Sequence, residues 1–361
     1  MTKEFEPACR RMEWLDPFYK QVWEKAFAKA IPISGTFELT PRCNFKCKMC
    51  YVHLEDREIS CYGRELSAKE WISIAEAAKK AGTTWLCITG GEPFLHPEFE
   101  TIWKELSEMG FFLTLQTNAS LISKWEKLLQ KYPPRQVKIT LYGTNNTIYE
   151  NVCGIKNGFS HVNDGIHILM SLGIPVVLVS TIIRQNEDNA QDMAFYAYRH
   201  QLPWTLTSGI RKSIRNNGVD VSSLCLAEKR EEHLRKEIKR RWIEKDFLDP
   251  TRNPCSYCKD FRLGYWIHWD GKMRFCSFLN EPDISVKQVG FEEAWKQLVL
   301  FEEKLLWPKE CMSCSANKVC FKCAASLATE SGSVKKVSEA YCDKIRSLYE
   351  QIKREESKDE L

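Results

Sequence analysis

The sequence has no apolar run long enough to cross a membrane and no strong excess of charge of one sign. Its hydrophobic stretches fall short of the roughly 18 residues that a transmembrane helix requires. Lys and Arg number 52 and Asp and Glu number 48, so the net charge is only +4 over 361 residues. Nucleic-acid-binding proteins usually carry a concentrated basic surface. We therefore expect neither a membrane protein nor a nucleic-acid-binding protein.

The first residues also lack the apolar core of a secretory signal, since Met1–Arg11 is charged. The last four residues, Lys358-Asp359-Glu360-Leu361, spell an endoplasmic-reticulum retention signal. They stand in a stretch rich in Lys and Glu, which can produce this string by chance. We expect a cytoplasmic protein, whose thiols serve metal binding or catalysis rather than disulfides.

Cysteine is abundant, with sixteen residues, and three of them are packed into Cys43-Asn-Phe-Lys-Cys47-Lys-Met-Cys50. A four-iron cluster held by protein alone needs four thiolates. Three thiolates leave one iron with an open position, as a catalytic metal site requires. Zinc is the alternative, but it would need a fourth ligand close by, and His53 is the only local candidate.

This segment resembles the signature of the radical S-adenosylmethionine (SAM) superfamily. A strand-like run, Leu86–Thr89, leads into Gly90-Gly91-Glu92-Pro93, where glycines permit close backbone approach and a carboxylate can accept hydrogen bonds from an ammonium group. The resemblance implies that SAM chelates the open iron of a [4Fe–4S] cluster. It also implies that Gly90, Gly91, Glu92 and Pro93 contact the methionyl amine and that Tyr51 lies near the adenine.

Eight further cysteines follow residue 250: Cys255, Cys258, Cys276, Cys311, Cys314, Cys320, Cys323 and Cys342. Their arrangement resembles the SPASM extension of radical SAM enzymes, which carries two auxiliary four-iron clusters. By this resemblance the first cluster is held by Cys255, Cys258, Cys276 and Cys323, and the second by Cys311, Cys314, Cys320 and Cys342. Two four-cysteine zinc sites are the alternative, because Cys-x2-Cys is also zinc-ribbon spacing.

Two other cysteines have distinct expectations. Cys87 lies inside an apolar strand and is expected to be a small buried hydrophobic residue. Cys153 lies in an expected loop over residues 151–158, on the catalytic side, and is a candidate for a reactive role.

Strand-like and helical runs alternate along residues 34–207, which predicts an α/β fold with a parallel sheet. Strands are expected at Gly35–Thr40, Trp85–Thr89, Phe111–Gln116, Gln136–Leu141, Pro175–Thr181 and Trp204–Thr207. Helices are expected at Arg11–Ala30, Ser67–Ala81, Pro97–Met109, Ser120–Tyr132, Val162–Leu172, Glu187–His200 and Glu228–Glu244. Six such units make a partial (β/α)6 TIM-like barrel, as the resemblance also implies.

The sequence therefore divides into five expected segments. They are an N-terminal helical segment (1–33), the partial barrel (34–210), a helical linker (211–250), the cysteine-rich SPASM cluster domain (251–345) and a charged C-terminal tail (346–361).

Active sites of barrels lie at the C-terminal ends of the strands. This rule nominates Asn118, Thr140, Arg184 and Asn186, which follow or end three of the expected strands. In the family such positions contact ribose hydroxyls or the methionyl carboxylate. A polar cap at a strand end explains each of them equally well.

The resemblance implies reductive cleavage of SAM to a 5′-deoxyadenosyl radical that abstracts hydrogen from a substrate. Two auxiliary clusters suit electron removal, so the expected net reaction is an oxidation: a dehydrogenation or a C–S, C–C or C–O cross-link. We expect a peptide or protein substrate and a reductant such as flavodoxin or ferredoxin. The sequence does not identify a catalytic base; Asp260, His268, Tyr142 and Asp343 are candidates.

Three alternatives stay open at this point. One is a radical SAM dehydrogenase of a sugar, aminocyclitol or tetrapyrrole. Another is an anaerobic sulfatase maturase, which the nineteen residues after Cys342 disfavour, because such enzymes place an acidic residue well beyond their last cluster cysteine. The third is a non-catalytic iron–sulfur or zinc protein.

Overall fold

The structure, a computed structural model, describes residues 17–207, 209–213, 215, 221–226, 253–256, 258, 260–320 and 323–359. Its described strands form one sheet in the order β6-β5-β4-β3-β2-β1-β7-β8-β9. The first six strands are β1 (Ser34–Glu38), β2 (Trp85–Thr89), β3 (Phe112–Thr117), β4 (Gln136–Thr140), β5 (Val176–Thr181) and β6 (Trp204–Thr207). Each pairs in parallel with the next, so their C-terminal ends meet at one edge.

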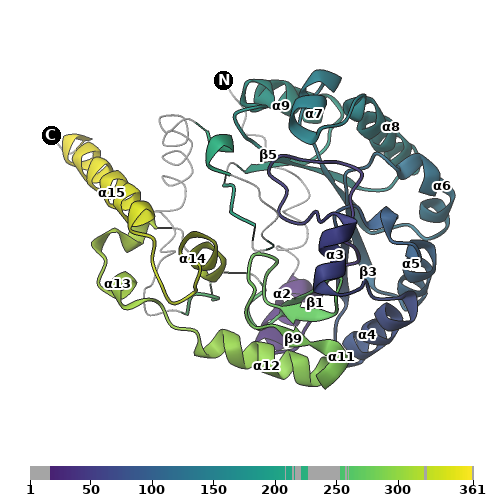
Figure 1. Cartoon of the computed structure of the whole chain (residues 1–361), viewed down its shortest axis with the longest axis horizontal. Coiled ribbons are helices and arrows are strands. Elements are labelled where there is room, and N and C mark those ends of the chain that lie inside the picture. Colours follow the sequence, from purple (N-terminus) through teal and green to yellow (C-terminus); the bar gives the residue numbers. More distant parts are fainter. Residues whose placement is uncertain are drawn as a thin grey trace.

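Helices cover the outer side of this sheet in an arc (Figure 1). The arc contains α4 (Ala68–Ala81), α5 (Phe99–Glu108), α6 (Ile122–Lys131), α8 (Gly158–Ser171) and α9 (Ala190–Arg199). In α4 the apolar residues Trp71, Ile74 and Ala78 are buried at helical spacing. The α/β prediction is confirmed: the sheet is dominated by parallel pairs and does not close into a complete barrel.

The capping box predicted for Ser67 and Glu70 is confirmed. The Ser67 hydroxyl accepts a hydrogen bond from Glu70 N at 3.4 Å, and the Glu70 carboxylate accepts one from Ser67 N at 2.9 Å. These bonds satisfy backbone N–H groups that the first turn of a helix leaves without partners.

The loop predicted across residues 151–158 is wrong over its first part, because α7 (Asn146–Cys153) is helical. Asn145 begins this helix by accepting a hydrogen bond from Ile148 N at 2.9 Å, and Gly154 ends it in the left-handed conformation. A second short helix, α3 (Asp56–Tyr62), was not predicted. At the N-terminus, α2 (Pro17–Lys29) is the described part of the helix expected at Arg11–Ala30. The helix expected at Glu228–Glu244 lies outside the described residues.

The cysteine-rich region extends the same sheet. β7 (Gly264–Ile267) pairs in parallel with β1, and β8 (Lys272–Arg274) and β9 (Ile284–Ser285) follow as antiparallel strands. Its helices are α11 (Val286–Val289), α12 (Phe291–Lys304), α13 (Lys309–Met312), α14 (Ala324–Ser331) and α15 (Glu339–Asp359). The short 3-10 segments are η1 (Pro93–Leu95), η2 (Glu187–Asn189), η3 (Ser222–Leu224) and η4 (Ser315–Val319).

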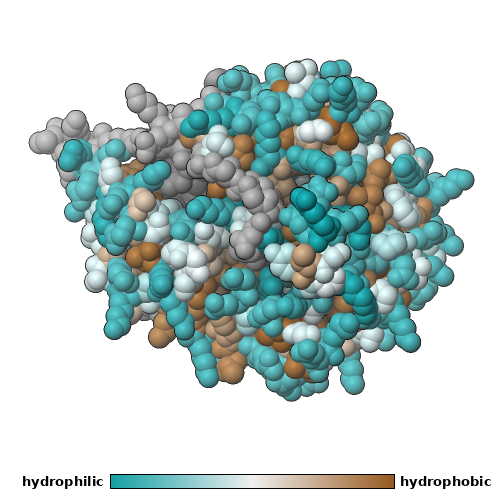
Figure 2. Space-filling view, in the orientation of Figure 1, coloured by the Kyte–Doolittle hydropathy of each residue, from teal (hydrophilic) through white to brown (hydrophobic). Residues whose placement is uncertain are grey.

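Tyr265 of β7 joins the two parts of the core. Its ring packs against Phe37 of β1 with centroids 6.5 Å apart, over Gly35, where an added Cβ would lie 2.4 Å from the ring. On the face shown in Figure 2, apolar residues are scattered among hydrophilic ones. None of the described helices has the length and apolar character needed to cross a membrane.

Candidate active site

A cavity of about 360 Å³ lies where the strands β2–β6 end, and all three clustered cysteines, Cys43, Cys47 and Cys50, line it. Each of these five strands ends on a threonine, and every one of these threonines lines the cavity: Thr89, Thr117, Thr140, Thr181 and Thr207. Because parallel strands present their C-terminal ends at one edge, the five side chains surround a common space. They supply neutral groups that can both donate and accept hydrogen bonds.

The cysteine loop is held by the C-terminal end of α7. Lys46 N donates to Cys153 O at 2.8 Å and Lys48 N donates to Val152 O at 3.0 Å, so the backbone on both sides of Cys47 is fixed. Cys153 is buried and contacts the Cys47 thiol, and this hydrogen bond together with burial raises the pKa of Cys47. The candidate role of Cys153 as a reactive cysteine stays a prediction.

Burial keeps the other two thiols protonated as well. It raises the pKa of Cys43 well above its usual range and that of Cys50 to about 11. Buried thiols of this kind become thiolates when a metal replaces their protons. Three such thiols on one cavity fit the donor set of an iron–sulfur cluster with one open iron. His53, the fourth zinc ligand considered above, does not line the cavity, and its Nε2 lies 3.4 Å from the Glu55 carboxylate.

The two glycines of the Gly-Gly-Glu-Pro segment line the cavity and pack tightly against the chain that leads to the cysteines. Gly91 N donates to Thr40 O at 2.7 Å, and Glu92 N donates to Arg42 O at 2.7 Å. A Cβ on Gly91 would lie 2.3 Å from Arg42 O. Both glycines are therefore required for close approach of two backbone segments.

Glu92 is fully buried and, like Pro93, does not line the cavity. Its carboxylate accepts hydrogen bonds from Thr117 Oγ1 at 2.8 Å and from Asn118 N at 2.8 Å. Burial raises the pKa of Glu92 to about 7. The carboxylate thus fixes the end of β3, including Asn118, which does line the cavity.

The remaining nominated residues divide into two groups. Tyr51, Asn118 and Thr140 line the cavity. Arg184 is exposed and does not: its Nε donates to Cys225 O at 2.6 Å. Asn186 is buried and donates to Tyr142 O at 3.0 Å, as a polar cap does.

Sequence reasoning missed several lining residues, among them Arg211, Trp266 and Phe278. The Tyr51 ring packs on Phe278 with centroids 4.1 Å apart, which brings the cysteine-rich region against the cysteine loop. Three of the threonines, Thr89, Thr181 and Thr207, end expected strands and were a partial signal for this ring of hydroxyls, whereas the expected third and fourth strands end at Gln116 and Leu141.

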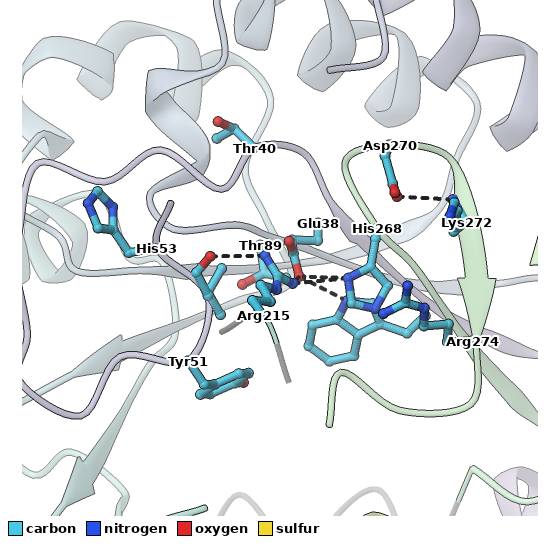
Figure 3. Close-up of polar contacts among 12 residues, drawn as sticks. Glu38, Thr40, Tyr51, His53, Thr89, Arg215, His268, Asp270, Lys272 and Arg274 are labelled. Atoms are coloured by element: carbon cyan, nitrogen blue, oxygen red, sulfur yellow. Dashed lines mark hydrogen bonds and ion pairs between the residues drawn. The ribbon is translucent and has the colours of Figure 1, made fainter. Parts of the chain in front are cut away.

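A buried polar network joins Glu38, Arg215 and His268 (Figure 3). Arg215 Nη2 donates to Glu38 Oε2 at 2.6 Å and lies 3.0 Å from His268 Nδ1, while its Nη1 donates to Val52 O at 2.9 Å. Trp266, a lining residue, donates from Nε1 to Glu38 Oε2 at 3.3 Å. The network therefore connects β1, β7 and the loop that follows Cys50.

Of the four candidate bases, only Tyr142 lines the cavity, and burial raises its pKa far above its usual range. Burial and the nearby Arg215 hold the pKa of His268 well below its usual range. Asp260 lies 3.9 Å from the Cys258 sulfur, and Asp343 is exposed and paired with Arg346 at 2.9 Å.

Contacts among the described residues bear on the two expected groups of downstream cysteines, whose membership stays a prediction. In the first, burial raises the pKa of Cys255, and the negative charges of Glu302, Cys258, Cys323 and Cys276 raise it further. Cys255 thus lies near the other three cysteines of its expected group. In the second, Cys314 and Cys320 flank η4 and pack with Tyr341 on α15, the helix that carries Cys342. Cys311 lies on α13, and its carbonyl accepts a hydrogen bond from Cys314 N at 3.4 Å.

In the described part of the chain, no three Cys, His or carboxylate groups converge closely enough to hold a single metal ion. That auxiliary clusters bind to these two groups stays a prediction.

Known proteins resemble this chain in sequence and in fold. Residues 37–197 match the radical SAM superfamily. The sporulation killing factor maturation protein SkfB of Bacillus subtilis is 27% identical over 270 residues, which cover 70% of this chain and 62% of SkfB. A probable GTP 3′,8-cyclase of Methanocella arvoryzae is 27% identical over 277 residues, which cover 73% of this chain and 87% of the cyclase.

The chain is similar in fold to SuiB of Streptococcus suis. The crystal structure of SuiB bound to SAM aligns with a TM-score of 0.63 and 16% identity, covering 95% of this chain and 82% of SuiB. The structure of SuiB bound to the precursor peptide SuiA also aligns with a TM-score of 0.63, at 17% identity, covering 90% of this chain and 80% of SuiB.

Proposed function

We propose that this chain, in which residues 37–197 form a radical SAM domain, is an enzyme that oxidatively modifies a peptide. One observation carries the proposal: three cysteines, a ring of strand-final threonines and aromatic residues of the cysteine-rich region line a single cavity. The combination supports a cluster-binding loop that faces a neutral polar surface and two aromatic side chains, Trp266 and Phe278, of the cysteine-rich region.

Cys43, Cys47 and Cys50 would hold a [4Fe–4S] cluster, and the residues present fit it, because three partly buried thiols on one cavity leave one iron open. When bound together with SAM, this cluster supplies a 5′-deoxyadenosyl radical that removes a hydrogen atom from the substrate. Asn118 and the threonine hydroxyls offer neutral partners for ribose and amino-acid groups. Tyr51, Trp266 and Phe278 supply an apolar surface that excludes water.

An oxidation requires that one electron leave the substrate after the hydrogen atom. The group formed by Cys255, Cys258, Cys276 and Cys323 would hold an acceptor cluster for that electron. Phe278 follows this group's Cys276 by two residues and packs on Tyr51, which follows Cys50 directly. The second group, Cys311, Cys314, Cys320 and Cys342, would extend the path toward an external acceptor.

The choice of a peptide substrate is supported by two similarities. SkfB is named as a maturation protein of a sporulation killing factor, and SuiB has been crystallised with a precursor peptide. GTP is the second candidate substrate, because the probable GTP 3′,8-cyclase matches a slightly larger share of this chain. Among the described lining residues only one side chain is cationic, Arg211, which suits a nucleoside triphosphate poorly.

The test uses protein purified and reconstituted anaerobically with iron and sulfide. We expect about twelve irons per chain, for three [4Fe–4S] clusters, and formation of 5′-deoxyadenosine from SAM with a flavodoxin or dithionite reductant. Replacing Cys43, Cys47 and Cys50 by Ala should remove about four irons and abolish 5′-deoxyadenosine formation. SAM cleavage that persists in this triple variant would contradict the assignment.

Substrate choice is tested separately, with short peptides encoded beside the gene and with GTP. A peptide product that is lighter by two hydrogens supports oxidative peptide modification. Conversion of GTP, with no change in any peptide, would replace the peptide by the nucleotide as the substrate.

A further inference from the structure

The cavity has two chemically different walls. One wall consists of neutral polar groups at strand ends, which include Thr89, Asn118 and Thr140. The other wall is aromatic and cationic: Trp266 and Phe278 come from the cysteine-rich region, and Arg211 comes from the segment after β6. In the sheet, β6 is separated from β3 by β4 and β5.

Arg211 carries the only charged side chain among the described residues that line the cavity. Its Nη2 donates to Ser326 Oγ of α14 at 3.2 Å, and its guanidinium lies 5.4 Å from the centroid of the Phe278 ring. These contacts hold the planar group in place on one side. An arginine has five N–H donors, so this arrangement leaves donors available to a ligand in the cavity.

We propose that Arg211 binds a carboxylate of the peptide substrate, either an Asp or Glu side chain or the free C-terminus. The proposal rests on the proposed function, since it concerns the peptide that the cavity accepts. No Asp or Glu side chain is among the described lining residues, so within that part of the cavity a carboxylate of the ligand can supply the opposite charge. A guanidinium binds a carboxylate through two parallel hydrogen bonds, and this charge-assisted pair is strong where water is excluded.

SAM also carries a carboxylate, but the position of Arg211 favours the peptide. Arg211 contacts Phe278 and Ser326, both of the cysteine-rich region, whereas Gly90 and Asn118 belong to the neutral wall. A substrate must lie between the radical source at the cysteine loop and the acceptor cysteines, and this is the side on which Arg211 stands. A nucleoside triphosphate fits less well, because it would bring several negative charges to the single cationic side chain of Arg211.

The experiment uses anaerobic holoenzyme with SAM and a library of random heptapeptides, half with free and half with amidated C-termini. We expect the wild-type protein to bind peptides that contain Asp or Glu more tightly than matched peptides that contain Asn or Gln. Alternatively, it should bind peptides with a free C-terminus more tightly than amidated ones. Arg211→Gln should reduce this preference by about tenfold to a hundredfold, the effect of losing a charge-assisted hydrogen bond. Arg211→Glu should shift the preference to Lys and Arg. Lys212→Gln, which changes the neighbouring exposed cation, should preserve the wild-type preference.

Three results would overturn the inference; the first two leave the proposed function intact, and the third would also argue for a nucleotide in place of a peptide as the substrate. The first is a wild-type protein that cleaves SAM but shows no preference for acidic peptides or free C-termini. The second is an Arg211→Gln variant whose Kd for SAM rises more than tenfold with unchanged peptide selection, which would assign the residue to the SAM carboxylate. The third is an Arg211-dependent affinity for GTP that exceeds the affinity for any peptide. Absence of 5′-deoxyadenosine from the wild-type protein would instead defeat the proposed function itself.

Discussion

The Glu38–Arg215 pair shows how a single buried charge pair can support the site. Both side chains are nearly inaccessible to solvent, and Arg215 also holds the carbonyl of Val52 in the cysteine loop. Arg215→Met would leave the Glu38 carboxylate buried without a cation, which typically costs about 3–5 kcal/mol of unfolding free energy. We expect the double variant Glu38→Gln/Arg215→Met to be more stable than Arg215→Met. Urea unfolding of the wild type, both single variants and the double variant measures this coupling; additive effects would contradict it.

His268 should make stability depend on pH in one direction. Burial and nearby Arg215, Arg274 and Lys272 hold its pKa in the folded state well below 6.5, so the unfolded state binds the proton first as pH falls. Stability supplied by neutral His268 is present above about pH 6.5 and is lost below it, at a slope of up to about 1.4 kcal/mol per pH unit. His268→Asn keeps an acceptor for Arg215 but cannot titrate. Its unfolding free energy should therefore fall less steeply than that of the wild type between pH 6.5 and 5.5.

The control for this experiment is His161→Asn, which changes an exposed histidine and should follow the wild-type slope. If unfolding free energy changes with pH at the same slope in the wild type and in His268→Asn, folding does not lower the pKa of His268 and this prediction is wrong.

Residues whose role depends on local spacing were the easiest to predict. Cys43, Cys47 and Cys50 line the cavity together because three cysteines within eight residues must share one loop. Arg184 and Arg211 show the limit of such reasoning. Both follow strands, but only the fold reveals that Arg184 turns toward Cys225 whereas Arg211 reaches the cavity. That difference depends on contacts between segments far apart in the chain.

At the scale of elements, the pairing between the Gly-Gly segment and the chain before Cys43 positions the cysteine loop. Gly91→Ala would bring a methyl group to 2.3 Å from Arg42 O, and neither backbone can move without losing a hydrogen bond. We expect a loss of about 1–3 kcal/mol in unfolding free energy and less iron per chain after reconstitution. Gly209→Ala is the matched control, since it also lies on the cavity but its Cβ would be 3.7 Å from the nearest atom. Full iron loading of Gly91→Ala would mean that the loop tolerates displacement.

Within residues 34–207, element prediction succeeded where periodicity was long and failed where it was short; in the cysteine-rich region even the long helices α12 and α15 were not predicted. Strands β1–β6 begin and end within two residues of the expected positions, because apolar runs between helices leave little choice. The helix α7 was missed because it is only eight residues long and is formed by a cap and three buried side chains, Tyr149, Val152 and Cys153. Strand β7 was missed because its four residues, Gly264–Ile267, acquire strand structure by pairing with β1 more than 200 residues earlier.

At the scale of the whole molecule, that pairing makes the radical SAM domain and the cysteine-rich region parts of one sheet. The expected boundary at residue 251 stays a prediction, but β7 pairs with β1 and α12 packs on α4. Besides its contact with Phe37, Tyr265 lies 5.0 Å from the ring of Phe291, and Trp295 Nε1 donates to Ala30 O at 2.7 Å. A sheet and a core shared in this way should unfold cooperatively.

Tyr265 offers the sharpest test of this cooperativity, because it belongs to the cysteine-rich region and fills the core beside β1. Tyr265→Ala should cost about 3–5 kcal/mol, as other large-to-small aromatic changes do. Tyr265→Phe keeps the ring and loses only the hydrogen bond to Thr83 Oγ1 at 3.1 Å, so it should cost about 1 kcal/mol. If the sheet is one unit, far-ultraviolet circular dichroism and tryptophan fluorescence should report the same lowered midpoint for Tyr265→Ala. A midpoint that shifts in only one of the two signals would instead reveal two regions that unfold separately.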